Sequence, residues 1–167
     1  MKTITKRVIS GILILILFLS TIHFETFAAS SKTKFSGKCG NNLTWLFDSS
    51  TDTLTISGTG EMDNYYKNRP WYNLDDLTGG YFPYIKSVII KDGVTSIGDY
   101  AFSDLGTLSN IVIPDSVTAI GEGVFSGCSN LESLTIPDRV TSIGAYAFYK
   151  CTSLTSITIP DMVTSLG

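Results

Sequence analysis

From residue 85 onwards, apolar and polar residues follow a pattern that returns at a constant interval. Each unit reads as L-x-x-[VIL]-x-I, then Pro-Asp in three of four units, then V-T-x-I-G and A-F-x-x-C or close variants. The units begin at Ile85, Leu108, Leu131 and Leu154, a period of 23, and the fourth reaches Gly167 before its A-F-x-x-C segment. A fixed period in the twenties is typical of a solenoid, in which each repeat is one coil stacked on the previous coil.

Apolar residues at equivalent positions form four columns that predict a continuous core, because a single coil cannot bury them alone. Phe125 lies in the middle of its column, and we expect its side chain to be fully buried. The columns are Ile90, Ile113, Ile136 and Ile159; Val94, Val117, Val140 and Val163; Ile97, Ile120, Ile143 and Leu166; and Phe102, Phe125 and Phe148.

The third unit illustrates the elements expected in each coil. Leu134 and Ile136 are apolar and two residues apart, which predicts a short strand with one buried face. Pro137 ends that strand because proline has no N–H for a ladder. V-T-x-I-G predicts a second short extended segment, and its recurring glycine, Gly144 here, indicates positive φ or a tight corner. A-F-x-x-C is expected to form one helical or 3₁₀ turn.

The unit L-x-S-[IVL]-x-I-P-D-x-V-T-x-I-G-x-x-[AV]-F-x-x-C resembles the BspA-type leucine-rich repeat of bacterial surface proteins. The resemblance covers residues 85–167 position by position. It extends more loosely to C-G-x-N-L-T-W at 39–45, L-T-I-S-G-T-G-x-M at 54–62 and P-W-Y at 70–72. It implies a β-rich solenoid, exposure at the cell surface, and adhesion to components of a host or a neighbouring cell.

Residues 1–28 have the composition of a secretory signal peptide. Lys2, Lys6 and Arg7 precede an apolar run from Val8 to Leu19, and small residues follow near Ala28. An uncleaved anchor helix is the alternative, although the run is short for a span of ~20 residues. Cleavage would leave a mature chain that begins at residue 29 and has no membrane attachment.

Residues 29–84 differ in composition from the repeats and are interpreted as an N-terminal β cap with an aromatic insertion. Residues 43–47 and 53–56 are strand-like and are separated by five turn-forming residues, which predicts a β-hairpin. A solenoid needs such a terminal unit to cover its first coil. Tyr81 and Phe82 lie in the aromatic stretch beside Gly79 and Gly80, where they form either a contact patch or packing onto the first coil. The repeats then occupy 85–167.

Charge and histidine content exclude several functions. The net charge is −3, and cleavage of residues 1–28 leaves 9 basic and 14 acidic residues. The basic residues form no stripe, so nucleic acid is a poor candidate partner. The single histidine, His23, lies in the signal segment, so the mature chain cannot build a Ser-His-Asp or Cys-His site. We therefore expect no catalytic site, no metal site and no cofactor.

Cys128 and Cys151 share one repeat position, which the first unit fills with Leu105. Leucine at this position indicates an apolar site and therefore buried free thiols. Neighbouring coils ~4.8 Å apart also leave a disulfide within reach. Cys39 is expected to be buried in the cap.

The outward positions of the first strand form the expected binding surface, since the resemblance places ligands on this face. The alternative is a merely solvated sheet face. The candidate ligand-binding residues are Asn110, Ser133, Thr135, Ser156 and Thr158 on the strands, and Tyr81 and Phe82 in the insertion.

The sequence thus predicts a β-rich solenoid of leucine-rich repeats with an N-terminal β-hairpin cap. The expected function is non-catalytic, adhesion-type binding of an extracellular protein or glycan by a secreted or cell-surface protein. The alternative is that these repeats are the leading module of a larger secreted enzyme. The last coil, from Leu154, leaves an apolar strand edge open, which predicts self-association through that coil.

Overall fold

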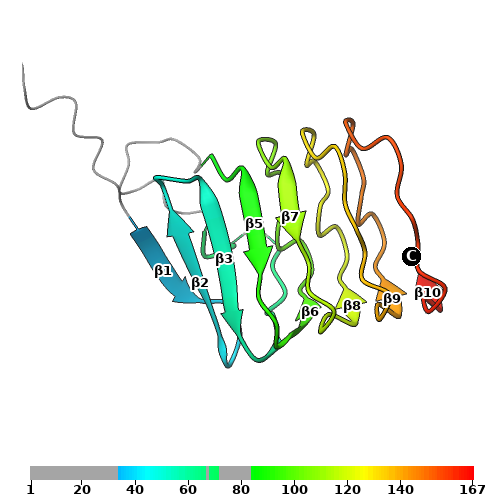
Figure 1. Ribbon diagram of the computed structural model, residues 1–167, viewed down its shortest axis with the longest axis horizontal. Coiled ribbons are helices and arrows are strands. Elements are labelled where there is room, and N and C mark those ends of the chain that lie inside the picture. The colour runs from blue at the N-terminus through cyan, green and yellow to red at the C-terminus, as the bar shows by residue number, and fades with distance from the viewer. Residues whose placement is uncertain (1–33, 67, 72–83) are drawn as a thin grey trace, which may run out of the picture. The chain divides into compact units, whose positions relative to one another are not determined.

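The computed structural model describes residues 34–66, 68–71 and 84–167, and these form ten β-strands and no helix (Figure 1). The strands lie in two five-stranded sheets. The predicted signal peptide falls outside the described residues, as does most of the predicted aromatic insertion, including Tyr81 and Phe82. The described chain is therefore a β-rich repeat fold.

The first sheet has the strand order β1-β2-β3-β5-β7. Its strands are β1 (Lys34–Lys38), β2 (Leu43–Asp48), β3 (Thr53–Gly58), β5 (Ser87–Ile90) and β7 (Asn110–Val112). The predicted hairpin is present as β2 and β3, which pair antiparallel, and β3, β5 and β7 then pair in parallel. The hairpin and the repeats consequently share one sheet.

Four of the five strands of the second sheet come from V-T-x-I-G segments, which confirms the second short strand predicted for each unit. Its members are β4 (Gly60–Glu61), β6 (Val94–Ile97), β8 (Ala119–Ile120), β9 (Ser142–Ile143) and β10 (Ser165–Leu166). All neighbours in it are parallel, and from β6 to β10 each residue pairs with its equivalent in the next repeat.

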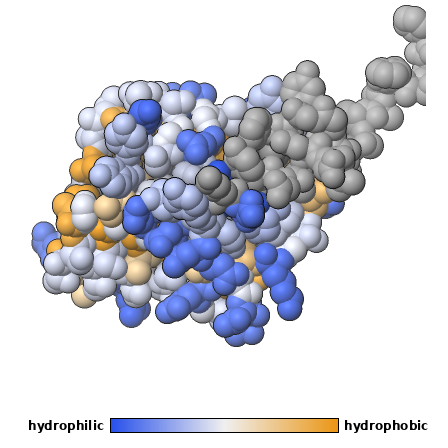
Figure 2. Space-filling view, turned by 180° about the vertical axis from the view of Figure 1, so that it is seen from behind, coloured by the Kyte–Doolittle hydropathy of each residue, from blue (hydrophilic) through white to orange (hydrophobic). Residues whose placement is uncertain are grey.

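The core lies between the two sheets and follows the predicted columns. Phe125 is fully buried, with ring centroids 6.0 Å from Phe102 and 5.8 Å from Phe148. Trp71 extends this stack, since its ring lies 5.7 Å from that of Phe102. Burial decreases in the last coil, where Ile159 is 37% and Leu166 is 66% exposed. Hydrophobic surface gathers at this end of the molecule, at the left of Figure 2.

The first strand predicted for the third and fourth units is absent from the structure, which corrects the expectation drawn from Leu134 and Ile136. Residues 131–137 and 154–160 form no strand and no backbone ladder with the preceding coil. Proline accounts for part of this difference. Lys91 in the first unit donates its N–H to the Ile56 carbonyl at 3.0 Å, whereas Pro114, Pro137 and Pro160 occupy the same position without an N–H.

The glycine that closes V-T-x-I-G is required because the backbone of the preceding coil approaches it closely, and not because its φ is positive. A Cβ on Gly98 would lie 1.9 Å from the Asp63 carbonyl oxygen, and one on Gly144 would lie 2.5 Å from the Glu122 nitrogen. Of the two alternatives drawn from the sequence, the tight corner is the one observed. Positive φ occurs instead in the A-F-x-x-C region, at Tyr100, Gly123 and Tyr146 and at Asp104, Gly127 and Lys150.

The A-F-x-x-C region forms hydrogen-bonded turns and not a helix. Within the first unit, the Ala101 N–H donates to the Gly98 carbonyl and the Ser103 N–H to the Tyr100 carbonyl, both at 3.2 Å. These i→i−3 bonds have the spacing of the predicted 3₁₀ turn, but the positive φ at Tyr100 and Asp104 prevents a continuous helix.

Residues 53–71 follow the path of one further coil, which the sequence pattern does not reveal. Thr53 pairs with Ser87 in the first sheet and Gly60 with Val94 in the second, and both separations in sequence are longer than the repeat period. Trp71 then takes the place of the recurring phenylalanine. The repeat path thus begins at the second strand of the hairpin.

Cys39, Cys128 and Cys151 are free thiols and are buried, as predicted. The Cys128 thiol donates to the Phe102 carbonyl and the Cys151 thiol to the Phe125 carbonyl, each at 3.1 Å. Burial raises the pKa of Cys128 to about 12. Each of these two thiols therefore bonds its coil to the coil before it.

Candidate binding surface

The outer face of the first sheet presents two rows of side chains whose positions follow from strand register. Exposure alternates along β2 and β7, so every second residue points away from the core. The first row contains Lys34, Asp48, Thr53, Ser87 and Asn110. The second row contains Ser36, Leu46, Thr55, Ile89 and Val112.

The second row has an apolar centre, which we call the outer strip: Leu46, Thr55, Ile89 and Val112. Leu46 is 39% and Val112 is 50% exposed, and Thr55 and Ile89 between them are half-buried. No carboxylate or amine belongs to the strip. The strip is therefore an uncharged and partly hydrophobic line across four adjacent strands.

The structure places five of the seven predicted ligand-binding residues at exposed positions. Asn110 is exposed on β7, where its side-chain amide donates to the Ser87 hydroxyl at 3.5 Å. Ser133, Thr135, Ser156 and Thr158 are exposed in the unpaired segments that follow. Tyr81 and Phe82 lie outside the described residues.

Leu46 and Thr55 were not among the residues selected from the sequence, because they belong to the hairpin and not to the repeat. A signal for them exists in the alternation of L-T-W-L-F-D and T-L-T-I-S-G, where they are outward-facing positions. What the sequence did not provide is the parallel pairing of β3 with β5, which aligns Thr55 with Ile89.

Charged groups lie at the border of this face. The Lys34 amine is 3.1 Å from an Asp48 carboxylate oxygen, and the Lys86 amine is 2.7 Å from one of Asp52. The pKa of Asp48 is lowered to about 2, first because the Ser50 hydroxyl and amide donate to it at 2.6 and 2.9 Å, and also because of Lys34. Both ion pairs lie on the same side of the outer strip, and neither belongs to it.

Two further properties of the described residues bear on function. Across residues 34–66, 68–71 and 84–167, no three His, Cys, Asp or Glu side chains are grouped so that they could hold a metal ion. Within the same ranges, no helix has the length and apolar character needed to cross a bilayer.

Comparison with known proteins identifies the repeat. The family model for the BspA type Leucine rich repeat region (6 copies) matches residues 81–167, just over half of the chain. A search of curated proteins found no match.

Three solved structures share the fold. A leucine-rich repeat protein from Eubacterium ventriosum is 26% identical, over 81% of this chain and 40% of its own, with a TM-score of 0.61. The T. pallidum protein TpLRR is 20% identical, over 74% of this chain and 60% of its own, with a TM-score of 0.55. A leucine rich cell surface protein from Faecalibacterium prausnitzii is 24% identical, over 83% and 46%, with a TM-score of 0.51. The chain thus spans 40–60% of the length of these proteins.

Proposed function

Because this chain belongs to the BspA-type leucine-rich repeat family, we propose that it is a secreted or cell-surface binding protein that performs no catalysis of its own. Its partner is an extracellular protein or glycan, and the exposed outer strip favours a protein. The surface location is supported by the similarity to a protein described as a leucine rich cell surface protein.

The observation that carries this proposal is the composition of the outer strip. Protein interfaces have cores that are depleted of charge and rims that are polar. Here Leu46, Ile89 and Val112 form an uncharged centre, and the Lys34–Asp48 and Lys86–Asp52 pairs lie towards the border. A flat face without aromatic rings offers little to stack on a sugar, so a protein partner fits it better.

We also propose that the hairpin acts as the N-terminal cap of a solenoid. The pairing of β3 with β5 covers an edge of the repeat sheet. On the turn side, the indole N–H of Trp71 donates to the Ala101 carbonyl at 3.1 Å, and Arg69 donates to the Tyr100 carbonyl at 3.0 Å. At its N-terminal end the sheet is closed by the edge strand β1, which carries Lys34 and Lys38, and lysines discourage pairing with another chain.

The test uses fluorescently labelled residues 29–167 on intact cells of candidate hosts or neighbours, before and after protease or periodate treatment. Val112→Asp and Thr135→Lys place charge on the face without removing a core residue, and both should reduce binding. Thr95→Lys, an exposed change on the second sheet, is the matched control and should leave binding unchanged. Binding should disappear after protease treatment.

The proposal fails if cell binding survives Val112→Asp and Thr135→Lys in chains that remain folded. Loss of binding on Tyr81→Ala or Phe82→Ala alone would assign the site to the insertion and not to the strand face. Loss on periodate but not on protease would identify a glycan as the partner.

A further inference from the structure

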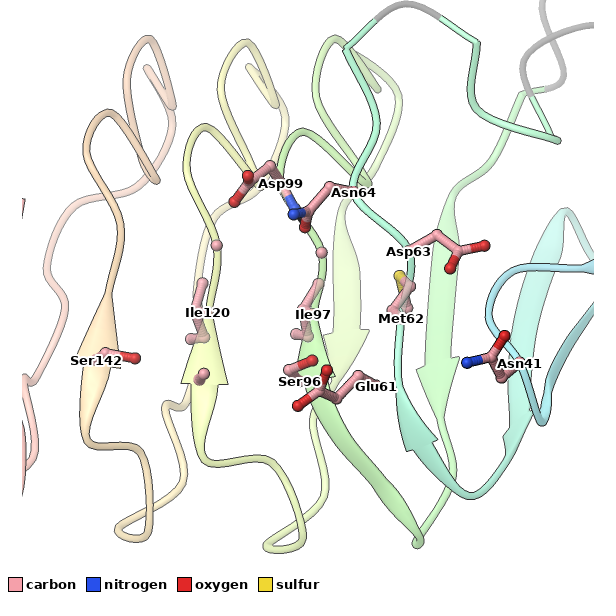
Figure 3. A pocket seen from close by; sticks show the side chains of 13 residues that line it. Asn41, Glu61, Met62, Asp63, Asn64, Ser96, Ile97, Asp99, Ile120 and Ser142 are labelled. Atoms are coloured by element: carbon pink, nitrogen blue, oxygen red, sulfur yellow. Dashed lines mark hydrogen bonds between the residues drawn. The ribbon is translucent and has the colours of Figure 1, made fainter.

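A concave surface lies on the second sheet, away from the outer strip. It is a groove of about 530 Å³, and its lining includes the small residues Gly98, Ala119 and Gly121. Ile97 and Ile120 also line it (Figure 3). This volume is within the range of ~300–1,000 Å³ found for ligand sites.

The walls of the groove carry polar side chains from separate segments. Asn41 comes from the turn between β1 and β2, Glu61 from β4, Asp63 from the residues after β4, and Ser96 and Ser142 from β6 and β9. An amide and a hydroxyl both donate and accept hydrogen bonds, and a carboxylate accepts them. This mixture complements a ligand rich in hydroxyl groups, because each such hydroxyl also donates and accepts.

At one end of the groove, two successive hydrogen bonds join side-chain oxygens to backbone N–H groups. The Asn64 side-chain oxygen accepts the Asp99 N–H, and the Asp99 carboxylate accepts the Glu122 N–H, both at 2.8 Å. These bonds fix Asn64 and Asp99 in place. Glu61 and Asp63, in contrast, take part in neither of the two ion pairs found in the described part of the chain.

An aromatic pair, the exposed Tyr66 and the half-buried Tyr100, follows lining residues of that end in the chain. Tyr100 directly follows Asp99, and Tyr66 follows Asn64 by two residues. Their ring centroids are 5.8 Å apart at an interplanar angle of 86°, and Tyr66 is 77% exposed. The Tyr100 hydroxyl donates to the Glu122 carboxylate, which restricts its ring. Such rings offer an apolar face together with a polar tip.

We propose that this groove binds a neutral saccharide, and that Tyr66 and Tyr100, which follow the lining residues Asn64 and Asp99 in the chain, extend the site. The hydroxyl groups of the sugar bond to Asn41, Glu61 and Asp63, and the C–H face of one sugar ring packs on tyrosine. The same carboxylates repel anionic sugars, so acidic saccharides are excluded. This site is separate from the outer strip. A substitution on one surface can therefore serve as the control for binding at the other.

The experiment titrates purified residues 29–167 with hexasaccharides of N-acetylglucosamine, glucose, mannose and galacturonic acid, and with hexalysine, by calorimetry. At least one neutral hexasaccharide should bind, and galacturonic acid hexamer should not. Asn41→Ala and Tyr66→Ala should each weaken that binding by roughly tenfold. Thr135→Ala, in the strand-free segment 131–137, is the control and should leave it unchanged. Thermal unfolding of each variant checks that the fold is intact.

A charge-removing variant sharpens the test. Combining E61Q with D63N keeps the shapes of both side chains and removes two negative charges, so the galacturonic acid hexamer should now bind. The proposal is overturned if no neutral hexasaccharide binds, if Asn41→Ala and Tyr66→Ala have no effect, or if hexalysine alone binds. The last result would identify the groove as a site for cationic peptides.

Discussion

At the scale of single residues, the recurring polar positions of the repeat bond one coil to the next. The hydroxyl groups of Thr118, Thr141 and Thr164 donate to the carbonyl of the equivalent threonine in the preceding coil, at 3.2, 3.1 and 3.4 Å. The backbone N–H of each of these threonines donates to the same carbonyl. In the A-F-x-x-C turns, the thiols of Cys128 and Cys151 likewise donate to carbonyls of the preceding coil. These positions therefore recur for structural reasons.

Thiol reactivity provides a direct measurement of this arrangement. Because burial raises the pKa of Cys128 to about 12, very little thiolate exists near neutral pH, and only the thiolate reacts quickly. The folded chain should react slowly with a disulfide reagent at about pH 8 and quickly in denaturant. Since the folded pKa exceeds the ordinary value of 9.0, stability should also decrease as the pH rises from 9 towards 12.

Cys128→Ala is the control for that reaction. It removes one slowly reacting thiol, so the variant should label one thiol fewer in denaturant and should gain no rapidly reacting thiol when folded. Rapid labelling of Cys128 or Cys151 in the folded chain would contradict the buried, hydrogen-bonded thiol.

The corner glycine gives a second prediction at this scale. A Cβ at Gly144 would lie 2.5 Å from the Glu122 nitrogen and 2.6 Å from the Gly121 carbonyl carbon, and both are backbone atoms that cannot turn aside. Gly144→Ala should therefore reduce the free energy of unfolding by about 1–3 kcal/mol. Denaturant titration measures the change.

Gly106→Ala is the matched control. Its Cβ would meet only the Ser129 hydroxyl at 3.6 Å, an ordinary contact, and its φ is not positive. Equal stability of the two variants would show that the coils do not approach closely at the corner.

At the scale of elements, the aromatic stack joins the repeat to the N-terminal region. The rings of Trp71, Phe102, Phe125 and Phe148 follow one another at centroid distances of 5.7, 6.0 and 5.8 Å, with interplanar angles of 23°, 18° and 15°. Such a stack requires each coil to present its ring at the same height. A single ring removed from the middle leaves a cavity that the neighbouring coils cannot close without shifting.

Phe125→Ala should consequently cost roughly 3–5 kcal/mol of the free energy of unfolding. The control is Tyr149→Ala, since Tyr149 is 53% exposed and its loss should change stability by no more than about 0.5 kcal/mol. Denaturant unfolding of both variants gives the comparison. An unfolding energy for Phe125→Ala close to that of the original chain would contradict the stacked register.

The elements that sequence reasoning predicted are those governed by the constant repeat period. The repeat period predicted the apolar columns, the V-T-x-I-G strands and the burial of Phe125, because each contact recurs when the coils stack. The hairpin was predicted from the local alternation of apolar and polar residues. Sequence reasoning did not give the coil path of residues 53–71, because the longer separation between this coil and the next hides the equivalence of Trp71 and Phe102. Nor did it give the positive φ at Tyr100 and Tyr146, where tyrosine replaces the glycine of the second unit.

The candidate surfaces were predicted only in part, for a related reason. The exposure of Asn110 and Thr135 follows from the local alternation of apolar and polar residues, although residues 131–137 form no strand. The contribution of Leu46 depends on the parallel pairing of β3 with β5, which joins segments that the repeat period does not relate. The groove gathers Asn41, Glu61 and Ser142 from three distant parts of the chain, and no local pattern relates them.

At the scale of the whole described unit, apolar surface is distributed unevenly along the stack. The N-terminal side of the repeats is covered by the hairpin, Arg69 and Trp71. In the last coil, Ile159 is 37%, Met162 55% and Leu166 66% exposed, and Ile157 and Val163 are only half-buried. Phe148, in the coil before it, is also only half-buried. Among the described residues, none packs on the far side of this coil, and hydrophobic surface is visible there in Figure 2.

This end surface leads to a prediction about association. The backbone edge of β10 (Ser165–Leu166) is unpaired on its outer side within the described residues, and the apolar side chains lie beside it. Open strand edges next to apolar surface invite pairing with another chain, and repeat stacks without a polar terminal unit are poorly soluble. We therefore expect residues 29–167, expressed on their own, to sediment as dimers or larger species at high micromolar concentration.

Two variants make that expectation specific to the last coil. Met162→Lys and Leu166→Lys put charge on exposed side chains, so they should shift the sedimentation of residues 29–167 towards the monomer without lowering its unfolding temperature. Leu46→Lys, on the outer strip, introduces the same charge elsewhere and should leave the association unchanged. A chain that sediments as a cooperatively folded monomer without these substitutions would show that the last coil needs no cover. Association removed by Leu46→Lys, but not by Leu166→Lys, would move the contact between copies to the first sheet.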